Sequence, residues 1–271
     1  MRLLSVASLA GLSSRRRAFV AGVALIVVVL GVVAGVWATS GTAPQASRTQ
    51  RSDVLLVPGY GGSTTALDQL ASRIRQTGRR ATVVQLAGSG TGDLRVQARL
   101  LDGYVSRALQ AGSGPVTVIG YSAGGVVAWL WDVDYRGTSR VRRIITLGAP
   151  LHGARLAALG TAFDPGECPV ACQQLAPGSS LLAELQQSPV RRPPWLSLWT
   201  TDDQVVQPPD SARLAGAVNV ALQTICPGAD IQHDQLPTSS LVTGIVLRAL
   251  GAAPLATPAA AQCQSLQNLG R

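Results

Sequence analysis

The sequence of 271 residues contains no lysine, so its 23 basic side chains are all arginines. Four of these, Arg2 and Arg15 to Arg17, lie in the first segment, and the remaining 19 face 14 acidic residues, a net charge of +5. This balance is mild and the arginines are scattered, which argues against nucleic acid as a partner. A generally basic surface attracted to anionic envelopes fits the composition better.

The chain also lacks any internal repeat at the period of a solenoid or propeller, and its length suits one large α/β domain. The glycine-rich stretch 88–93 carries no phosphate-binding motif. Histidine occurs only twice, as His152 and His233. This scarcity leaves two candidates for any chemistry that requires an imidazole.

Residues 18–38 form an uncharged run of 21 residues, which as a helix matches a bilayer core of about 30 Å. Three arginines precede the run and no positive charge directly follows it, so we expect the remainder of the chain outside the cytoplasm. Arg16 and Arg17 resemble part of a twin-arginine export signal, and 36–38 offers a cleavage site. Residues 1–38 are therefore expected to be a signal peptide or, if uncleaved, a cell-membrane anchor.

Residues 39–52 are rich in small and polar side chains and are expected to be a flexible linker. Residues 53–252 then alternate apolar strand-like runs with helical patterns, which predicts a mostly parallel sheet with helices on both faces. The expected strands are 54–57, 81–86, 116–119, 141–147, 195–200 and 217–222, and the expected helices are 66–74, 94–109, 125–130 and 239–250.

Two segments of the chain have no clear period. Residues 151–194 contain six prolines and little regular pattern, and a segment of this length in a compact domain usually serves a site. We expect it to be a small cap beside the substrate pocket. Residues 253–271 are rich in alanine, proline and glutamine, and we expect them to be a C-terminal tail.

The motif G-x-S-x-G spans residues 120–124, directly after an apolar run and directly before a helical pattern. A strand, a sharp turn and a helix in this order are typical of a nucleophile elbow. The turn would expose the hydroxyl of Ser122 and direct the N–H of Ala123 at a developing oxyanion. The alternative is an ordinary Gly/Ser turn between a strand and a helix.

A second glycine-rich loop, 58–62, follows the first expected strand. In serine hydrolases of this order the loop after an early strand supplies another oxyanion N–H, and we assign that role to Tyr60. The alternative is a tight connection without a ligand role.

A nucleophilic serine needs a base. In serine hydrolases with a nucleophile elbow, the order of the catalytic residues along the chain is serine, acid, histidine. His233 fits, because it follows the last expected strand and precedes the closing helix. His152 comes before any acid that follows a strand, so we expect it to be a structural or pocket-edge histidine.

The acid should emerge from a strand end near the base. Asp203 is favoured because Val205 and Val206 follow it and would anchor its loop. Asp202 would then be a solvated neighbour, and Asp230 is the third candidate.

Four cysteines in an exported chain favour disulfides over free thiols or metal ligands. We favour the pairs Cys168–Cys172 and Cys226–Cys263, since the proline after Cys168 disfavours helix there and lets a short loop close. The alternative is a buried thiol at Cys226, with Cys263 unpaired or bonded to another molecule.

With these motifs the chain resembles the small bacterial secreted lipases of the α/β-hydrolase fold, often grouped as class 2 lipases. The resemblance covers residues 54–250 and rests on five segments: 57–62, 120–125, 146–150, 201–206 and 233–237. It implies Ser122 as nucleophile, Asp203 as acid, His233 as base, and Tyr60 and Ala123 as oxyanion donors. Pro58 stands where the family usually has histidine, and the smallest members lack both the 151–194 segment and the cysteines.

The function that we expect is an exported, monomeric serine esterase or lipase that acts on lipid or small-molecule esters without a metal or organic cofactor. One alternative is an acyltransferase in which an envelope alcohol replaces water. Another is a catalytically silent domain of the same fold that binds a surface.

Overall fold

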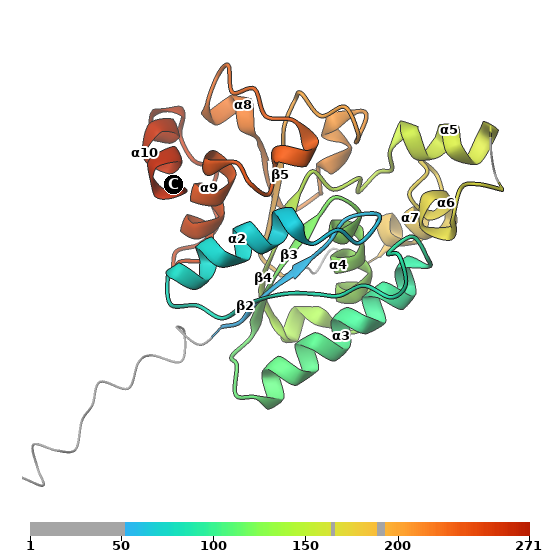
Figure 1. Ribbon diagram of the computed structural model, residues 1–271, viewed down its shortest axis with the longest axis horizontal. Helices are drawn as coiled ribbons and strands as arrows, with labels where there is room; N and C mark the ends of the chain where they lie inside the picture. Colours follow the sequence, from blue (N-terminus) through green and yellow to red (C-terminus); the bar gives the residue numbers. More distant parts are fainter. Residues whose placement is uncertain (1–51, 164–165, 189–192) are drawn as a thin grey trace, which may run out of the picture. The chain divides into compact units, whose positions relative to one another are not determined.

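The computed structural model describes residues 52–163, 166–188 and 193–271 (Figure 1). A six-stranded sheet runs through this part of the chain in the order β2-β1-β3-β4-β5-β6, and every neighbouring pair is parallel. The strands are β1 (Val54–Val57), β2 (Ala81–Val83), β3 (Val116–Tyr121), β4 (Val141–Leu147), β5 (Trp195–Trp199) and β6 (Val218–Ala221). The predicted parallel sheet is confirmed, with β2 shorter than expected.

The strands are mostly apolar because helices cover both faces of the sheet. In β1, Leu55 and Val57 join one buried cluster, whereas Val54 and Leu56 join the cluster on the opposite face. On the first face lie α3 (Leu94–Gln110) and α4 (Ala123–Asp134), and on the second lie α2 (Thr65–Gln76) and α9 (Ser240–Ala249). Continuous apolar runs in the sequence therefore correspond to strands buried on two sides.

The order of strands reverses next to β1. The chain passes from β1 outward to β2 and then returns to β3 on the other side of β1. The connections that leave the carboxyl ends of β1 and β3 therefore diverge, and ligands of open α/β sheets bind at such switch points. Loop 58–62 leaves one of these ends and Ser122 leaves the other.

The described residues of 151–194 form three helices rather than irregular chain: α5 (Arg155–Phe163), α6 (Val170–Gln174) and α7 (Ser180–Gln187). The disulfide Cys168–Cys172 joins α6 to the residues before it, with a Cα–Cα distance of 5.4 Å. Gln174 fastens α6 to the start of α3, because its amide accepts from the N–H of Leu94 at 2.8 Å and donates to Asp93 at 2.7 Å. α6 packs beside α3 and α7 beside α4, whereas α5 packs on α6 and extends away from α3 and α4 (Figure 1).

The C-terminal region has more structure than its composition suggests. After β6 come the short elements α8 (Leu222–Ile225) and η5 (His233–Gln235), then α9, η6 (Ala260–Gln262) and α10 (Cys263–Leu269). The tail expected at 253–271 thus ends in a helix, which packs on α9 (Figure 1). A Cβ on Gly244 or Gly270 would lie 1.9 Å from a carbonyl of the other helical segment, so glycine permits this close approach.

The second disulfide, Cys226–Cys263, joins the end of α8 to the start of α10. Both predicted pairings are therefore present, and all four cysteines are bonded. The expected signal or anchor at 1–38 and the linker residues 39–51 lie outside the described residues. In the ranges that are described, no helix is both long and apolar enough to cross a bilayer.

Candidate active site

Ser122 occupies the turn between β3 and α4 with a φ of 52°, a left-handed conformation that is rare for residues with a side chain. Its N–H donates to the carbonyl of Leu147 in β4 at 2.8 Å. A Cβ on Gly120 would lie 2.5 Å from the carbonyl of Gly124, and one on Gly124 would lie 2.3 Å from that of Val57. Sterics therefore require glycine at both of these motif positions. The backbone conformation at Ser122 costs about 1–3 kcal/mol of strain.

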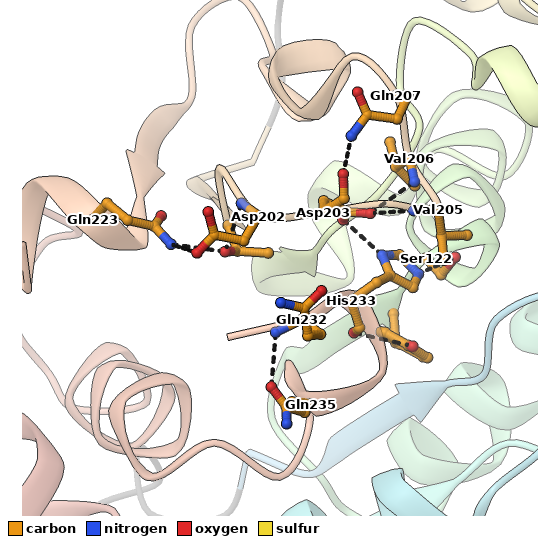
Figure 2. A network of polar contacts seen from close by, with 12 residues as sticks. Ser122, Asp202, Asp203, Val205, Val206, Gln207, Gln223, Gln232, His233 and Gln235 are labelled. Carbon is orange, nitrogen blue, oxygen red and sulfur yellow. Dashed lines mark hydrogen bonds and ion pairs between the residues drawn. The ribbon is translucent and has the colours of Figure 1, made fainter. Parts of the chain in front are cut away.

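The structure brings Ser122, His233 and Asp203 into one hydrogen-bonded chain (Figure 2). Oγ of Ser122 lies 3.0 Å from Nε2 of His233, and Nδ1 of the same ring lies 2.7 Å from Oδ2 of Asp203. The side chains of His233 and Asp203 are 7% and 1% exposed. A carboxylate at Nδ1 favours the tautomer with its proton there, which leaves the Nε2 lone pair for the serine hydroxyl.

The carboxylate of Asp203 uses both of its oxygens. Oδ1 accepts from the N–H groups of Val205 at 2.9 Å and Val206 at 2.7 Å, so Oδ2 is left for the imidazole. Asp202 turns the other way, and its Oδ2 accepts from Nε2 of Gln223 at 3.1 Å. The geometry thus places Asp203, and not its neighbour, beside His233.

Two residues from other segments hold His233 in place. The hydroxyl of Tyr121 donates to the His233 carbonyl at 3.2 Å, and the two ring centroids lie 5.2 Å apart. Burial, followed by the negative charges of Asp234 and Asp203, raises the pKa of Tyr121 above its usual range. Gly148 at the end of β4 lies behind the ring, and a Cβ there would be 3.1 Å from Nδ1.

The backbone around Ser122 fits the expected positions of the oxyanion donors. Ala123 is the first residue of α4, and the first N–H groups of a helix have no acceptor within it. Loop 58–62 passes directly over the serine, because a Cβ on Gly59 would lie 3.0 Å from Cβ of Ser122. Tyr60 follows in this loop with a side chain that is 45% exposed. The roles of the two N–H groups stay a prediction.

The remaining sequence candidates lie apart from this chain of hydrogen bonds. His152 is exposed in the turn after β4, and its Nδ1 lies 3.1 Å from the carbonyl of Ser211. Asp230 is exposed and accepts from Gln232 at 3.0 Å. Among the residues that the structure describes, no three His, Cys, Asp or Glu side chains group as ligands of a metal ion.

Gln223 is a residue that the sequence did not single out. It lies in α8, directly after β6, and its amide contacts the loop that carries Asp203. A single glutamine after a strand matches no motif, so only its position directly after the last strand could have drawn attention to it. Tyr121 was visible only as a variable position of G-x-S-x-G.

Large apolar side chains are exposed in the connections that leave the carboxyl ends of the strands. We call four of them the apolar rim: Tyr60, Leu156, Leu159 and Val205, which are 43–61% exposed. Leu156 and Leu159 lie on α5, whose first N–H, that of Arg155, donates to the carbonyl of Gln207 at 2.9 Å. The start of α5 is thus attached to the loop that carries Asp203.

A hollow of about 570 Å³ is lined in part by Asp203. Its walls include Asp202, Gln207, Gln223 and Asp230, and Ser122 is not among them. The hollow therefore borders Asp203 and does not include Ser122.

No family model matches the sequence, and no curated protein is similar to it in sequence. Solved structures are similar in fold. The mature lipase BlEst2 of Bacillus licheniformis is 20% identical with a TM-score of 0.63, and the match covers 77% of this chain and 95% of that one. A structure of the metagenome-derived lipolytic enzymes LipS and LipT is 18% identical with a TM-score of 0.57, covering 74% of this chain and 94% of that one.

Lipase B of Aspergillus fumigatus is 19% identical with a TM-score of 0.69, and the match covers 84% of this chain. The match spans 59% of the fungal protein. At these identities the likeness concerns the fold. The parallel sheet with helices on both faces and these neighbours fit the α/β-hydrolase fold.

Proposed function

We propose that this protein is an exported serine hydrolase that cleaves carboxylic esters of lipid-like character through an acyl-enzyme. The observation that carries the proposal is the hydrogen-bonded chain from Ser122 through His233 to Asp203, with the serine on a strained turn between β3 and α4. A likeness in fold to proteins described as lipases and lipolytic enzymes supports it. The fold by itself would not support a specific function, since one fold hosts many functions.

In the proposed acylation step, Oγ of Ser122 attacks the ester carbonyl carbon while Nε2 of His233 takes the hydroxyl proton. The carbonyl oxygen becomes an oxyanion, which the N–H groups of Ala123 and Tyr60 stabilise. Asp203 stabilises the imidazolium through its bond to Nδ1. When the carbonyl re-forms, the bond to the alcohol oxygen breaks, and Nε2 returns the proton to the departing alcohol.

Water repeats the cycle on the acyl-enzyme. His233 takes a proton from the water as its oxygen attacks the acyl carbon, and the same donors hold the second oxyanion. Collapse breaks the bond to Oγ of Ser122, which recovers its proton from the imidazolium. The products are a carboxylic acid and the free serine. Every step uses side chains and backbone of this chain, so the mechanism requires no cofactor.

The apolar rim supports an ester with an apolar group. Tyr60 and Val205 belong to the two loops that hold the proposed oxyanion donor and the acid, and α5 adds two exposed leucines. In the proposal, the acyl chain of an ester bound at Ser122 would contact these exposed side chains and bury part of their surface.

We also propose that the domain works outside the cytoplasm. Two disulfides use all four cysteines, and such bonds persist in oxidising compartments. Residues 18–38 would be the signal or the membrane anchor, and the domain would act as a monomer. Mass spectrometry of the mature N-terminus tests the cleavage, and recovery of active, full-length protein from the cytosol contradicts both versions.

A fluorophosphonate probe and a p-nitrophenyl ester together test the activity. We expect the probe to label Ser122 and the ester to be hydrolysed, and we expect Ser122→Ala and His233→Ala to lower kcat by about 10⁴-fold or more. His152→Ala is the matched control and should retain activity. A Ser122→Ala variant that hydrolyses the ester like the wild type would contradict the proposal.

A further inference from the structure

Gln223 links the two loops that bring Asp203 and His233 together. We call residues 200–207 the acid loop and residues 226–235 the base loop. We propose that Gln223 is a positioning residue of the reaction, which fixes the acid loop against the base loop through its side-chain amide. The inference depends on the proposed roles of Ser122, Asp203 and His233.

Three hydrogen-bond contacts join Gln223 to the acid loop, and two of them involve Thr200 and Thr201. Its Oε1 accepts from the N–H of Thr201 at 2.9 Å, and its Nε2 donates to Oγ1 of Thr200 at 2.8 Å. Thr200 is fully buried. A backbone N–H can only donate, so the amide oxygen must face Thr201, and this fixes the direction of the NH₂ group.

The NH₂ group then faces three acceptors. Besides Thr200, these are Oδ2 of Asp202 at 3.1 Å and the carbonyl of Ala229 at 2.9 Å. Two hydrogens serve three acceptors, so the donor capacity of the amide is fully used. Ala229 belongs to the base loop, four residues before His233. One side chain therefore spans from the end of β5 to the segment that leads to the base.

Gln223 does not lie next to Ser122, where the ester would react. Figure 2 shows Gln223 and Ser122 on opposite sides of Asp203. Gln223 therefore acts through the separation of acid and base rather than through the ester. A small misplacement of catalytic groups can cost about 100-fold in rate. The expected signature is a loss in kcat with KM unchanged.

The substitution Gln223→Glu keeps the length of the side chain and exchanges the donor for an acceptor. Once ionised, the new carboxylate faces Asp202 and the Ala229 carbonyl, both of which are acceptors. Asp203 and Asp230 line the same hollow, so acidic groups of both loops face this position. At acidic pH the new carboxyl is protonated and donates one bond, and at alkaline pH it repels the acid loop.

The experiment measures kcat and KM of the full-length protein on a p-nitrophenyl ester from about pH 5 to about pH 9. For Gln223→Glu we expect kcat to fall about tenfold or more relative to wild type at the alkaline end and to recover at the acidic end. Gln204→Glu is the control, because this exposed residue lines the same hollow and introduces the same charge. Its profile should parallel that of the wild type.

Two further variants cover the case in which Gln223→Glu does not fold. Gln223→Met removes every hydrogen bond without a charge, and we expect a lower kcat with a pH profile parallel to wild type. In the double variant Asp202→Asn/Gln223→Glu the new amide can donate to the new carboxylate, and we expect part of the alkaline loss to be regained. A folded Gln223→Met with kcat within about twofold of wild type overturns the inference.

A Gln223→Glu profile that parallels that of Gln204→Glu overturns it as well. Labelling of Ser122 by the fluorophosphonate probe separates this failure from a failure of the proposed function. If Ser122 is labelled and Ser122→Ala is inactive while both Gln223 variants behave like wild type, only the role of Gln223 is wrong. If Ser122→Ala keeps full activity, the proposed function is wrong.

Discussion

The hydroxyl of Tyr121 donates to the backbone carbonyl of His233 at 3.2 Å, which ties the strand before the serine to the loop that carries the imidazole. Tyr121 directly precedes Ser122 in the chain. Its bond to the His233 carbonyl therefore holds the backbone at Ser122 close to the backbone at His233, without using the hydroxyl of Ser122 or the imidazole of His233. Since burial raises its pKa, the phenol remains a neutral donor across the range in which a histidine base works.

Tyr121→Phe removes this bond and keeps the ring. The carbonyl of His233 would keep the N–H of Leu236 at 3.2 Å but lose the phenol as its second donor, so we expect the free energy of unfolding to fall by about 1 kcal/mol or less. We also expect kcat to fall several-fold, with KM little changed. Urea unfolding and ester kinetics measure the two effects. An unchanged kcat would mean that the base loop is held without this bond.

The same variant should change the alkaline stability of the protein. In the unfolded chain a tyrosine has a pKa of about 10, whereas in the folded protein the pKa of Tyr121 is higher. Between these two pKa values the unfolded state binds fewer protons, so the free energy of unfolding falls as pH rises above about 10. Below that pH the contribution is fully present. Wild type should therefore lose more stability than Tyr121→Phe between about pH 9 and about pH 11, and parallel losses would contradict this.

Asp203→Asn and Asp202→Asn form a matched pair of adjacent, isosteric changes. At residue 203 the amide would face Nδ1 of His233 and favour the wrong tautomer, so we expect kcat to fall by about 10⁴-fold. At residue 202 the amide oxygen can still accept from Gln223, so we expect most of the activity to remain. Ester kinetics with both variants decide between the residues. Equal losses would place the acid at the other position or at neither.

The sequence predicted the sheet because most of its strands are largely apolar runs, and β1 and β5 are buried at every position. It also predicted the sharp turn at Ser122 between β3 and α4, because the glycines of the motif follow from local sterics: a Cβ on Gly120 or Gly124 would meet backbone within 2.5 Å. The sequence favours Asp203 over Asp202 because two valines follow it, but only Val206 is a buried apolar anchor, whereas Val205 is 43% exposed. Both valines hold the loop through their backbone N–H groups, which donate to Oδ1 of Asp203. These are properties of short stretches of chain.

What the sequence could not predict depends on contacts between distant stretches. Gln223 belongs to no motif, and its role follows only from the approach of the acid and base loops. The packing of α10 on α9 depends on Gly244 and Gly270, which are 26 positions apart in the printed sequence and carry no helical pattern of their own. The helices of 151–194 were missed because prolines and short lengths obscure their period.

Gly148→Ala tests the wall behind His233. Gly148 has a φ of +56°, and an added Cβ would lie 2.6 Å from Leu236 and 3.1 Å from Nδ1 of His233. Gly78→Ala is the control, because Gly78 has a φ of +81° and no atom within 4 Å of the new Cβ. Both should lose about 1–2 kcal/mol from the backbone conformation. Only Gly148→Ala should also lose kcat, by about tenfold or more. Comparable kinetics for the two variants would show that the ring tolerates the methyl group.

The two disulfides differ in the length of chain that they close, and this predicts different costs of removal. Cys226–Cys263 spans 37 residues and encloses the base loop and α9, whereas Cys168–Cys172 spans 4. In the chain-entropy model the first contributes about 4 kcal/mol and the second about 2 kcal/mol. The double variants Cys226→Ala/Cys263→Ala and Cys168→Ala/Cys172→Ala leave no unpaired thiol from the broken bond.

We expect Cys226→Ala/Cys263→Ala to have the lower Tm and to be cleaved by protease between α9 and α10, because the bond joins the start of α10 to the end of α8. Leu266 and the glycine contacts would still hold α10 on α9, so the helix should open locally before the sheet unfolds. Activity should fall with the same opening, since residues 226–235 lead into His233. Limited proteolysis with mass spectrometry, read beside Tm and ester hydrolysis, measures all three. A Cys168→Ala/Cys172→Ala variant that is the less stable of the two would show that loop length does not govern these bonds.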